Sequence, residues 1–215
     1  MQSIFGEVRQ IGFMSRDIDS SMRFFAESCG VGPWFVLRHL DAAMLYKGNA
    51  IQLDVSIAMA NCGDLQFEIV MQHNDTPSLY TDALVGIPGL HIQHMGVWSR
   101  DVVRLQAAAH IRGWETVFET KSGPGKSIFL IHPGDPAVCI ELSDCDPFKD
   151  GVRESVRSHA AEWDGSDPIR EGLPHWNGTV IAGNRRALFS PIHHTANVTP
   201  CPPMPERDRG VGNES

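Results

Sequence analysis

The chain contains one internal repeat of eight residues. The segment 10–17 reads QIGFMSRD, and the segment 94–101, which begins 84 positions later, reads HMGVWSRD. Glycine, serine, arginine and aspartate recur in register, and the first position holds a polar side chain that can bind a metal ion in both copies. Such a repeat indicates two copies of one supersecondary unit that share a core. The sequence therefore predicts two similar halves with a site built between them.

The composition of the chain disfavours nucleic-acid-binding, membrane and secreted proteins. The 215 residues carry a formal net charge of −8, which disfavours nucleic acid as a partner because nucleic-acid binding needs a basic face. No apolar run approaches the ~18–20 residues that span a bilayer. The five cysteines include no Cys-x-x-Cys pair, and the start of the chain lacks the features of a secretory signal. We expect a cytoplasmic protein that acts on a small molecule, without contact to nucleic acid or membrane.

The same order of predicted elements appears in both halves, namely a strand, a helix and then three strands. Alternating apolar residues, helical spacing and turn residues mark the boundaries. In the first half we expect strands at 8–15, 34–40, 50–59 and 65–72, with a helix capped by Asp17. In the second half we expect strands at 91–99, 114–120, 127–132 and 137–142, with a helix at 101–112 capped by Asp101. This order predicts an α+β fold of paired βαβββ modules.

The predicted organisation has five parts. Residues 1–75 form the first module, 76–90 a connector, 91–148 the second module, 149–170 a C-terminal helix and 171–215 an irregular or disordered tail. The tail is assigned from its composition, because six of the 14 prolines fall between Pro174 and Pro205 and the segment has little apolar periodicity.

Each half also carries a glutamate inside an apolar strand. Glu68 lies in QFEIV and Glu141 in CIELS, and a carboxylate in such surroundings needs a partner to offset its desolvation. With Gln10 and His94, they make two polar residues per half at equivalent places, which is a donor set suited to a divalent cation. The simpler alternatives are a polar Gln10 at a strand end and a core histidine at His94 with internal partners.

Two neighbours of these residues are placed by strand alternation. Gln72 lies four positions after Glu68 and is in phase with it, so it is predicted to point toward the same site. Gln93 precedes His94 directly and is predicted to face away from the site.

These motifs resemble those of the vicinal oxygen chelate superfamily, whose members include glyoxalase I, methylmalonyl-CoA epimerase, extradiol dioxygenases and bleomycin-resistance proteins. The resemblance covers residues 5–145 and rests on the Gln/His-hydrophobic-Gly opening and the Glu-containing closing strand of each half. It implies a cupped mixed sheet around a metal site, with Gln10, Glu68, His94 and Glu141 as ligands. The cofactor would be one divalent metal ion, chosen from Zn, Mn, Co, Ni, Mg or Fe, and a homodimer is left open.

The leading functional hypothesis is a metal-dependent isomerase, epimerase or lyase acting on a small carbonyl or carboxyl compound. The metal would stabilise an enolate, and Glu68 or Glu141 would act as the base, with Gln72 orienting. The alternative is a metal-free protein that binds a drug or an aromatic molecule between aromatic side chains, namely Trp34, Phe35, Trp98, Trp114 and Phe129. A ring-cleaving dioxygenase is a third reading, weakened because Gln10 replaces a histidine.

Overall fold

The computed structural model describes residues 3–120, 125–174 and 180–181. The first module contains β1 (Val8–Met14), α1 (Ile18–Cys29), β2 (Trp34–Tyr46), β3 (Asn49–Cys62) and β4 (Leu65–Gln72). The connector contains α2 (Leu79–Ala83). The second module contains β5 (His91–Ser99), α3 (Val102–His110), β6 (Glu115–Thr120), β7 (Ser127–His132) and β8 (Asp135–Asp144). The chain continues with α4 (Pro147–Ala161), β9 (Ile169–Glu171), β10 (Leu173–Pro174) and β11 (Val180–Ile181).

The repeated aspartate begins the module helix in both halves. The Asp17 carboxylate accepts a hydrogen bond from the Ser20 amide, and the Asp101 carboxylate accepts one from the Arg104 amide, each at 3.0 Å. These side chains pair amide groups that the first helical turn leaves without intrahelical partners. The repeated residues thus start α1 and α3 at equivalent points of the two modules.

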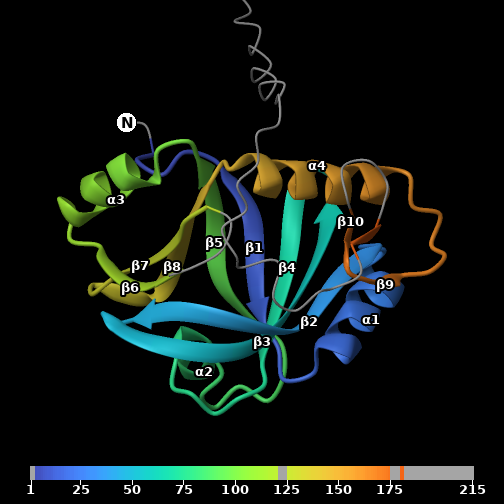
Figure 1. The fold of residues 1–215 in the computed structure, drawn as a ribbon, viewed down its shortest axis with the longest axis horizontal. Helices are drawn as coiled ribbons and strands as arrows, with labels where there is room; N and C mark the ends of the chain where they lie inside the picture. The colour runs from blue at the N-terminus through green and yellow to red at the C-terminus, as the bar shows by residue number, and fades with distance from the viewer. Residues whose placement is uncertain (1–2, 121–124, 175–179, 182–215) are drawn as a thin grey trace, which may run out of the picture.

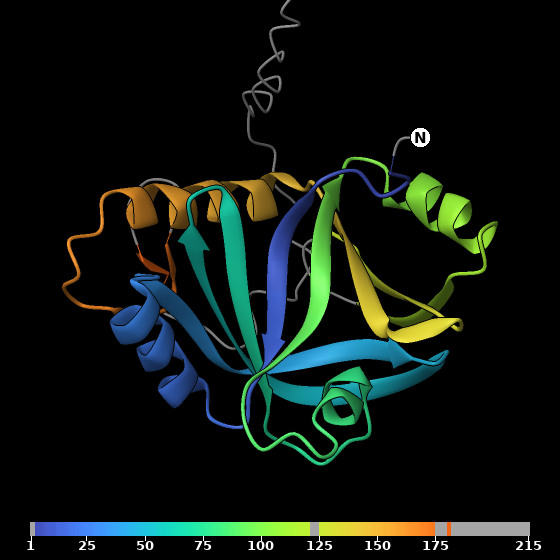
Figure 2. The same ribbon diagram turned by 180° about the vertical axis from the view of Figure 1, so that it is seen from behind.

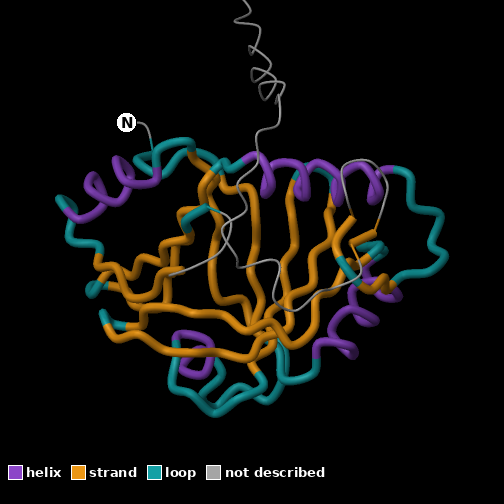
Figure 3. Tube along the Cα trace, viewed as in Figure 1, coloured by secondary structure: helices purple, strands orange, loops and turns teal. Residues whose placement is uncertain are grey.

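The two modules join in one mixed sheet. Its strand order is β3-β4-β1-β5-β8-β7-β6-β2-β9, with β3 also paired to β2. β1 is parallel to β4, β5 is parallel to β8, and the two modules meet where β1 and β5 run antiparallel. Because β2 pairs with both β3 and β6, the sheet curls into a barrel-like cup (Figures 1 and 3). The predicted α+β fold of paired βαβββ modules forming a cupped sheet is confirmed.

The helices lie around this cup. α1 and α3 lie on the outside of the first and second modules, and α4 runs across one end of the central strands (Figure 2). The outer face of the first module packs Phe13, Met22 and Phe25 into one apolar cluster, whereas Val97, Val102 and Leu130 belong to the corresponding cluster of the second module. A third cluster, which includes Phe35, Phe129 and Val156, fills the inside.

Several elements differ in extent from the prediction. β2 and β3 continue to Tyr46 and Cys62, because long hairpin strands stay paired beyond the point where their apolar alternation weakens. α4 begins at Pro147 and ends at Ala161 instead of covering 149–170, and Asp146 caps it through the amides of Phe148 and Lys149. The first residue of the predicted tail belongs to β9, which pairs with β2.

Two further expectations concern parts of the chain beyond the sheet. No helix in the described ranges combines the length and the apolarity needed to cross a membrane. The predicted tail lies largely outside the described residues, which include only 171–174 and 180–181 of it.

Candidate metal centre

Strand alternation brings the two glutamates and the histidine to the inner face of the cup. On β4 the odd positions Phe67 and Ile69 pack outward against α1, so Glu68 points inward. On β8, Ile140 and Leu142 face outward in the same way, and Glu141 faces inward. Glu68, His94 and Glu141 each offer a ligand atom, and all three atoms lie within 4.8 Å of one another.

Two glycines of the repeat make room for this cluster. In the β1–β5 pairing, Gly12 stands opposite His94 and Gly96 stands opposite Gln10. A Cβ atom at Gly12 would lie 1.8 Å from His94 Cε1, and one at Gly96 would lie 2.7 Å from Gln10 Oε1. The first side chain of each repeat therefore lies over the glycine of the other repeat. Only glycine allows this crossing, because any Cβ would occupy the space of the imidazole or the amide.

A bulge in β5 sets the orientation of His94. Gly12 pairs with His94 and Phe13 pairs with Ile92, so Gln93 is an extra residue on its strand. The prediction that Gln93 faces away from the site is wrong, because the bulge breaks the alternation. Gln93 is buried, and its Oε1 accepts a hydrogen bond from His94 Nδ1 at 2.8 Å. This bond places the imidazole proton on Nδ1 and directs the Nε2 atom at the two carboxylates.

The geometry around His94 Nε2 fits a divalent cation. The atom is buried and has no hydrogen-bond partner, yet it lies 3.3 Å from Glu141 Oε2 and 3.5 Å from Glu68 Oε2. Ligands about 2.1 Å from one ion are separated by roughly 3.0–3.4 Å when they subtend angles of about 90–110°. One imidazole and two carboxylates are hard or borderline donors that suit such an ion. The second nitrogen of His94, bonded to Gln93, has the outer partner that metal-binding histidines commonly possess.

Gln10, the fourth predicted ligand, borders the same cavity as the glutamates. Its Nε2 donates a hydrogen bond of 2.9 Å to Gln66 Oε1 on the neighbouring strand, which leaves its carbonyl oxygen as the end that suits a cation. Gln66 Nε2 is buried without a partner. The structure therefore brings Gln10 next to the cluster and adds Gln66, a residue that sequence reasoning missed.

Gln72, the other predicted site residue, is engaged elsewhere. Its Nε2 donates to the carbonyl oxygens of Asn74 and Thr76 at 2.8 and 2.7 Å, and its Oε1 accepts from Ser78 Oγ at 2.6 Å. These bonds hold the beginning of the connector against β4. Its polar atoms are therefore used by this loop, and Gln72 is not among the residues that line the cavity containing Glu68 and Glu141.

The charges of the cluster stabilise one another. Burial alone would lower the pKa of His94, but the carboxylates of Glu141 and Glu68 overcome this effect and raise it to about 9. Burial would raise the pKa of Glu141, but the His94 imidazole and then the Lys149 ammonium hold it at about 2. Without an ion, the cluster is therefore a buried imidazolium held between carboxylates.

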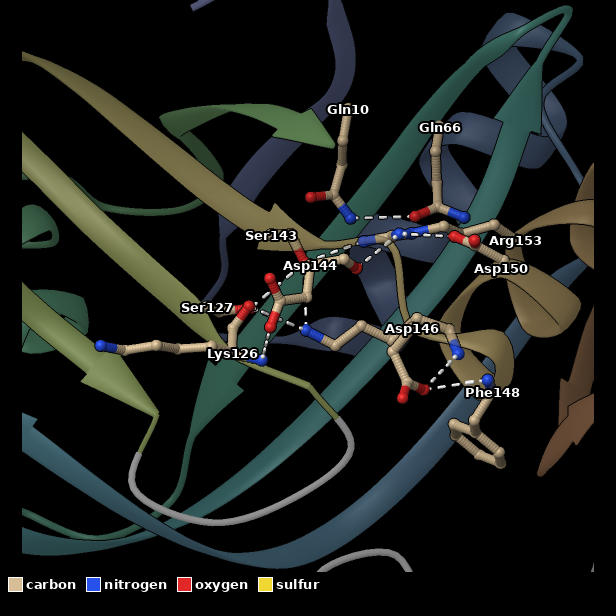
Figure 4. A network of polar contacts seen from close by, with 11 residues as sticks. Gln10, Gln66, Lys126, Ser127, Ser143, Asp144, Asp146, Phe148, Asp150 and Arg153 are labelled. Carbon is tan, nitrogen blue, oxygen red and sulfur yellow. Dashed lines mark hydrogen bonds and ion pairs between the residues drawn. The ribbon is translucent and has the colours of Figure 1, made fainter. Parts of the chain in front are cut away.

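A cavity of about 190 Å³ opens above the cluster. Glu68 and Glu141 line one part of it, and the side chains of Leu37, Leu40, Ile57 and Met59 form an apolar wall. Helix α4 contributes Phe148, Lys149, Val152 and Arg153 to the lining. Figure 4 shows the Arg153 guanidinium bonded to Ser143 beside the paired amides of Gln10 and Gln66.

The basic residues of α4 were not identified from the sequence. Lys149 and Arg153 are four positions apart and share a helix face, which is the one signal that could have found them. Deciding that this face covers the cup required the tertiary structure. The aromatic side chains expected to line a binding pocket serve other roles: Trp34, Phe35 and Phe129 are buried in the apolar clusters, Trp114 packs at the edge of one, and Trp98 stacks under Arg153.

The chain belongs to the glyoxalase/bleomycin resistance protein/dioxygenase superfamily. The model of that family matches residues 9–131, which is more than half of the 215 residues. The match covers both copies of the repeat and thus the β1–β5 junction at which the cluster lies. This confirms the resemblance found in the sequence. Among curated proteins, none matches this sequence.

Solved structures of low sequence identity are similar to this fold. A protein from Bacillus halodurans C-125 described as hypothetical is 16% identical, covers 64% of this chain and 93% of its own, and has a TM-score of 0.46. Methylmalonyl-CoA epimerase from Mycobacterium tuberculosis is 15% identical, covers 67% and 91%, and has a TM-score of 0.45. Another methylmalonyl-CoA epimerase structure is 18% identical, covers 67% and 98%, and has a TM-score of 0.43.

The glycine crossing predicts the effect of adding one methyl group. Gly12→Ala should displace the His94 ring and weaken zinc binding by at least about 100-fold, because a misplaced ligand is comparable to a lost one. Gly89→Ala is the matched control, since nothing lies within 4 Å of its added Cβ. Both variants are measured by zinc titration against a competing chelator.

The clash should also be visible in stability. Gly12→Ala is expected to lower the melting temperature, because the added methyl group meets the His94 ring, whereas Gly89→Ala should melt like the parent protein. If Gly12→Ala binds zinc like the parent protein, the crossing does not position His94.

The raised pKa of His94 predicts a proton-linked metal affinity. Below pH 9 the imidazole holds a proton that an incoming ion must displace, whereas Glu141 with its low pKa has none to release. Zinc affinity should therefore rise about tenfold per pH unit up to about pH 9 and then level off, with one proton released at pH 7. Calorimetry in buffers of different ionisation enthalpy counts that proton, and a count of zero at pH 7 would contradict the assignment.

Proposed function

We propose that the protein is a divalent-metal-dependent enzyme that removes a proton next to a carbonyl group of a small carbonyl or carboxyl compound. Isomerisation, epimerisation and elimination share this first step. The observation that carries the proposal is the buried Nε2 atom of His94, which has no hydrogen-bond partner and faces two carboxylates at the floor of a cavity.

Glu68, His94, Glu141 and the carbonyl oxygen of Gln10 would hold the ion. When bound, a divalent ion supplies Lewis acidity, which favours negative charge on a substrate oxygen. The two carboxylates differ in their surroundings. Glu141 is the more enclosed, with 8% of its side chain exposed against 18% for Glu68. The positive charge of Lys149 also lowers the pKa of Glu141.

These surroundings suggest a division of roles. Glu141 is the better anchor, because the neighbouring positive groups favour its ionised form. Glu68 is the better candidate for the base that takes the proton, because its side chain is the more exposed of the two. A base must come within about 2.6–3.2 Å of the proton donor or act through one water.

The apolar wall of the cavity and the enclosed floor support this reading over a metal-free binding protein. The two carboxylates, the imidazole and the amide oxygen of Gln10 form a donor set that suits a divalent cation, which a metal-free binding protein does not need. The cavity is also smaller than the roughly 300–1,000 Å³ typical of sites for drug-sized ligands.

The test is exchange of a carbon-bound hydrogen with solvent. Zinc-, cobalt- or manganese-loaded protein in D₂O is incubated with 2-oxo acids, 3-oxo acids and malonyl thioesters, and loss of the α-proton signal is followed by NMR. Exchange that depends on the metal supports the proposal. Oxygen consumption without exchange would establish a dioxygenase, and ligand binding by a protein that takes up no metal would establish a binding protein.

Variants assign the base. Glu68→Gln should slow exchange by about 10²–10⁴-fold while metal affinity falls much less, since removing a general base has effects of that size. His94→Ala should abolish exchange by removing the metal. Glu115→Gln, at an exposed position on β6, is the matched control and should exchange normally. If Glu141→Gln retains the metal and loses exchange while Glu68→Gln does not, the two roles are reversed.

A further inference from the structure

The side-chain amide of Gln10 has two different ends, and only one of them can bind a cation. The carbonyl oxygen is an acceptor, whereas the NH₂ group is a donor, and the two exchange places when the amide turns over. The role of Gln10 as a ligand therefore depends on what fixes its orientation. Gln10 is 5% exposed, so its protein neighbours decide which end faces the cluster.

The neighbours of Gln10 on its two sides differ in chemistry. Gln10 pairs with Gln66 on β4 and with Gly96 on β5. Its Nε2 atom donates a hydrogen bond of 2.9 Å to Gln66 Oε1, so that the two amides form a pair (Figure 4). Its Oε1 atom lies over Gly96, where an added Cβ would come within 2.7 Å of it. The nitrogen end is thus held by β4, and the oxygen end lies on the side of β5, the strand that carries His94.

The oxygen end of Gln10 faces acidic surroundings. Glu141 is the partner of Gly96 in the parallel pairing of β5 and β8, and Glu141 and Gln10 line the same cavity. A carboxylate and an amide oxygen are both acceptors, so they come together favourably only around a cation or a proton donor. In the absence of an ion, the reverse orientation would be the better one, because the NH₂ group of Gln10 would then face the carboxylates. The bond to Gln66, which is the one hydrogen bond that the Gln10 side chain forms within the described ranges, opposes that reversal.

Gln66 holds this orientation with its own nitrogen left unpaired. The residue is 1% exposed, and its Nε2 atom is buried without a hydrogen-bond partner. Buried donors without a partner are unfavourable and rare in folded proteins. If both amides turned over together, Gln66 Nε2 would donate to Gln10 Oε1 and gain the partner that it lacks, but Gln10 would then present its NH₂ group to the cluster. The observed pair therefore leaves a buried donor unpaired and keeps available the oxygen that an ion can bind.

From these contacts, which rest on the proposed metal function, we infer that Gln66 is a positioning residue of the metal centre. Its carbonyl oxygen holds the NH₂ group of Gln10 and thereby turns the Gln10 oxygen toward the ion, without touching the ion itself. β4 then serves the centre twice. It carries the ligand Glu68 and, two residues earlier and along the same cavity, the side chain that orients the ligand of β1.

A double-mutant cycle tests whether Gln66 acts through Gln10. Cobalt(II) is the probe, because its visible absorption reports the number and arrangement of its ligands as well as its binding. Gln10→Ala removes the ligand. Gln66→Leu removes the acceptor, so it should weaken cobalt binding by about 10- to 100-fold, the range for loss of a partner behind a ligand, and shift the spectrum toward that of Gln10→Ala. The double variant should bind cobalt like Gln10→Ala alone, because no orientation is left to lose.

Further variants separate positioning from a structural effect. Gln66→Glu keeps an oxygen that accepts from Gln10 Nε2, so it should retain the cobalt spectrum of the parent protein. Gln106→Leu is the matched control, since it removes a glutamine of the outer helix α3 that also forms one side-chain hydrogen bond, to Thr116 Oγ1 at 2.8 Å. It should bind cobalt like the parent protein. Gln66→Met, which keeps an unbranched side chain, serves if Gln66→Leu does not fold.

The outcomes separate the positioning role from the proposed function. Parent-like affinity and spectrum in Gln66→Leu, or losses that add in the double variant, overturn the positioning role and leave metal-dependent proton removal intact. If the cycle shows the expected non-additivity but the metal-loaded protein exchanges no carbon-bound hydrogen, the positioning role stands and the proposed chemistry is overturned. A parent protein that binds neither cobalt, zinc nor manganese overturns both.

Discussion

The close crossing of β1 and β5 is the constraint on which the rest of the site depends. Each strand carries a polar side chain and, two residues later, a glycine that lies under the polar side chain of the other strand. The parallel neighbours β4 and β8 place Glu68 beside Gly12 and Glu141 beside Gly96. The polar side chains of β1 and β5 thus point across the junction of the two modules in opposite directions. A side chain at either glycine would push β1 and β5 apart. The glycines of the repeat therefore set the short distance between these two strands.

The burial of charge follows from this crossing. His94 is almost fully buried with two carboxylates around it, and burial of an unpaired charge is strongly unfavourable. The carboxylates raise the pKa of His94, and the imidazole lowers that of Glu141, so the metal-free cluster is stabilised as an ion pair. A divalent ion would take the place of the proton with little change in the surrounding structure. The same groups can therefore stabilise the fold and remain ready for a cation.

The two modules and the helix that follows them contribute different chemistry. The modules are related by the repeat, and they present acidic and amide groups at the floor of the cup. Helix α4 has no counterpart in the repeat, and it brings the two cations that line the cavity. The lining of the cavity thus comes partly from outside the two modules.

Strand periodicity and the repeat determine much of this protein from the sequence alone. They predicted the order of elements, the two caps at Asp17 and Asp101, and the inward direction of Glu68 and Glu141, because these depend on local spacing. The bulge at Gln93 escaped prediction, since an extra residue is visible only when two strands are paired. The tertiary structure also decided that Gln10 bonds to Gln66, that Gln72 serves the connector and that Lys149 lies over the cavity. The contacts of Gln10 and Lys149 join segments far apart in the sequence, and no pattern in the sequence indicates that such segments meet. The contacts of Gln72 lie in a local turn, whose geometry depends on the structure that packs against it.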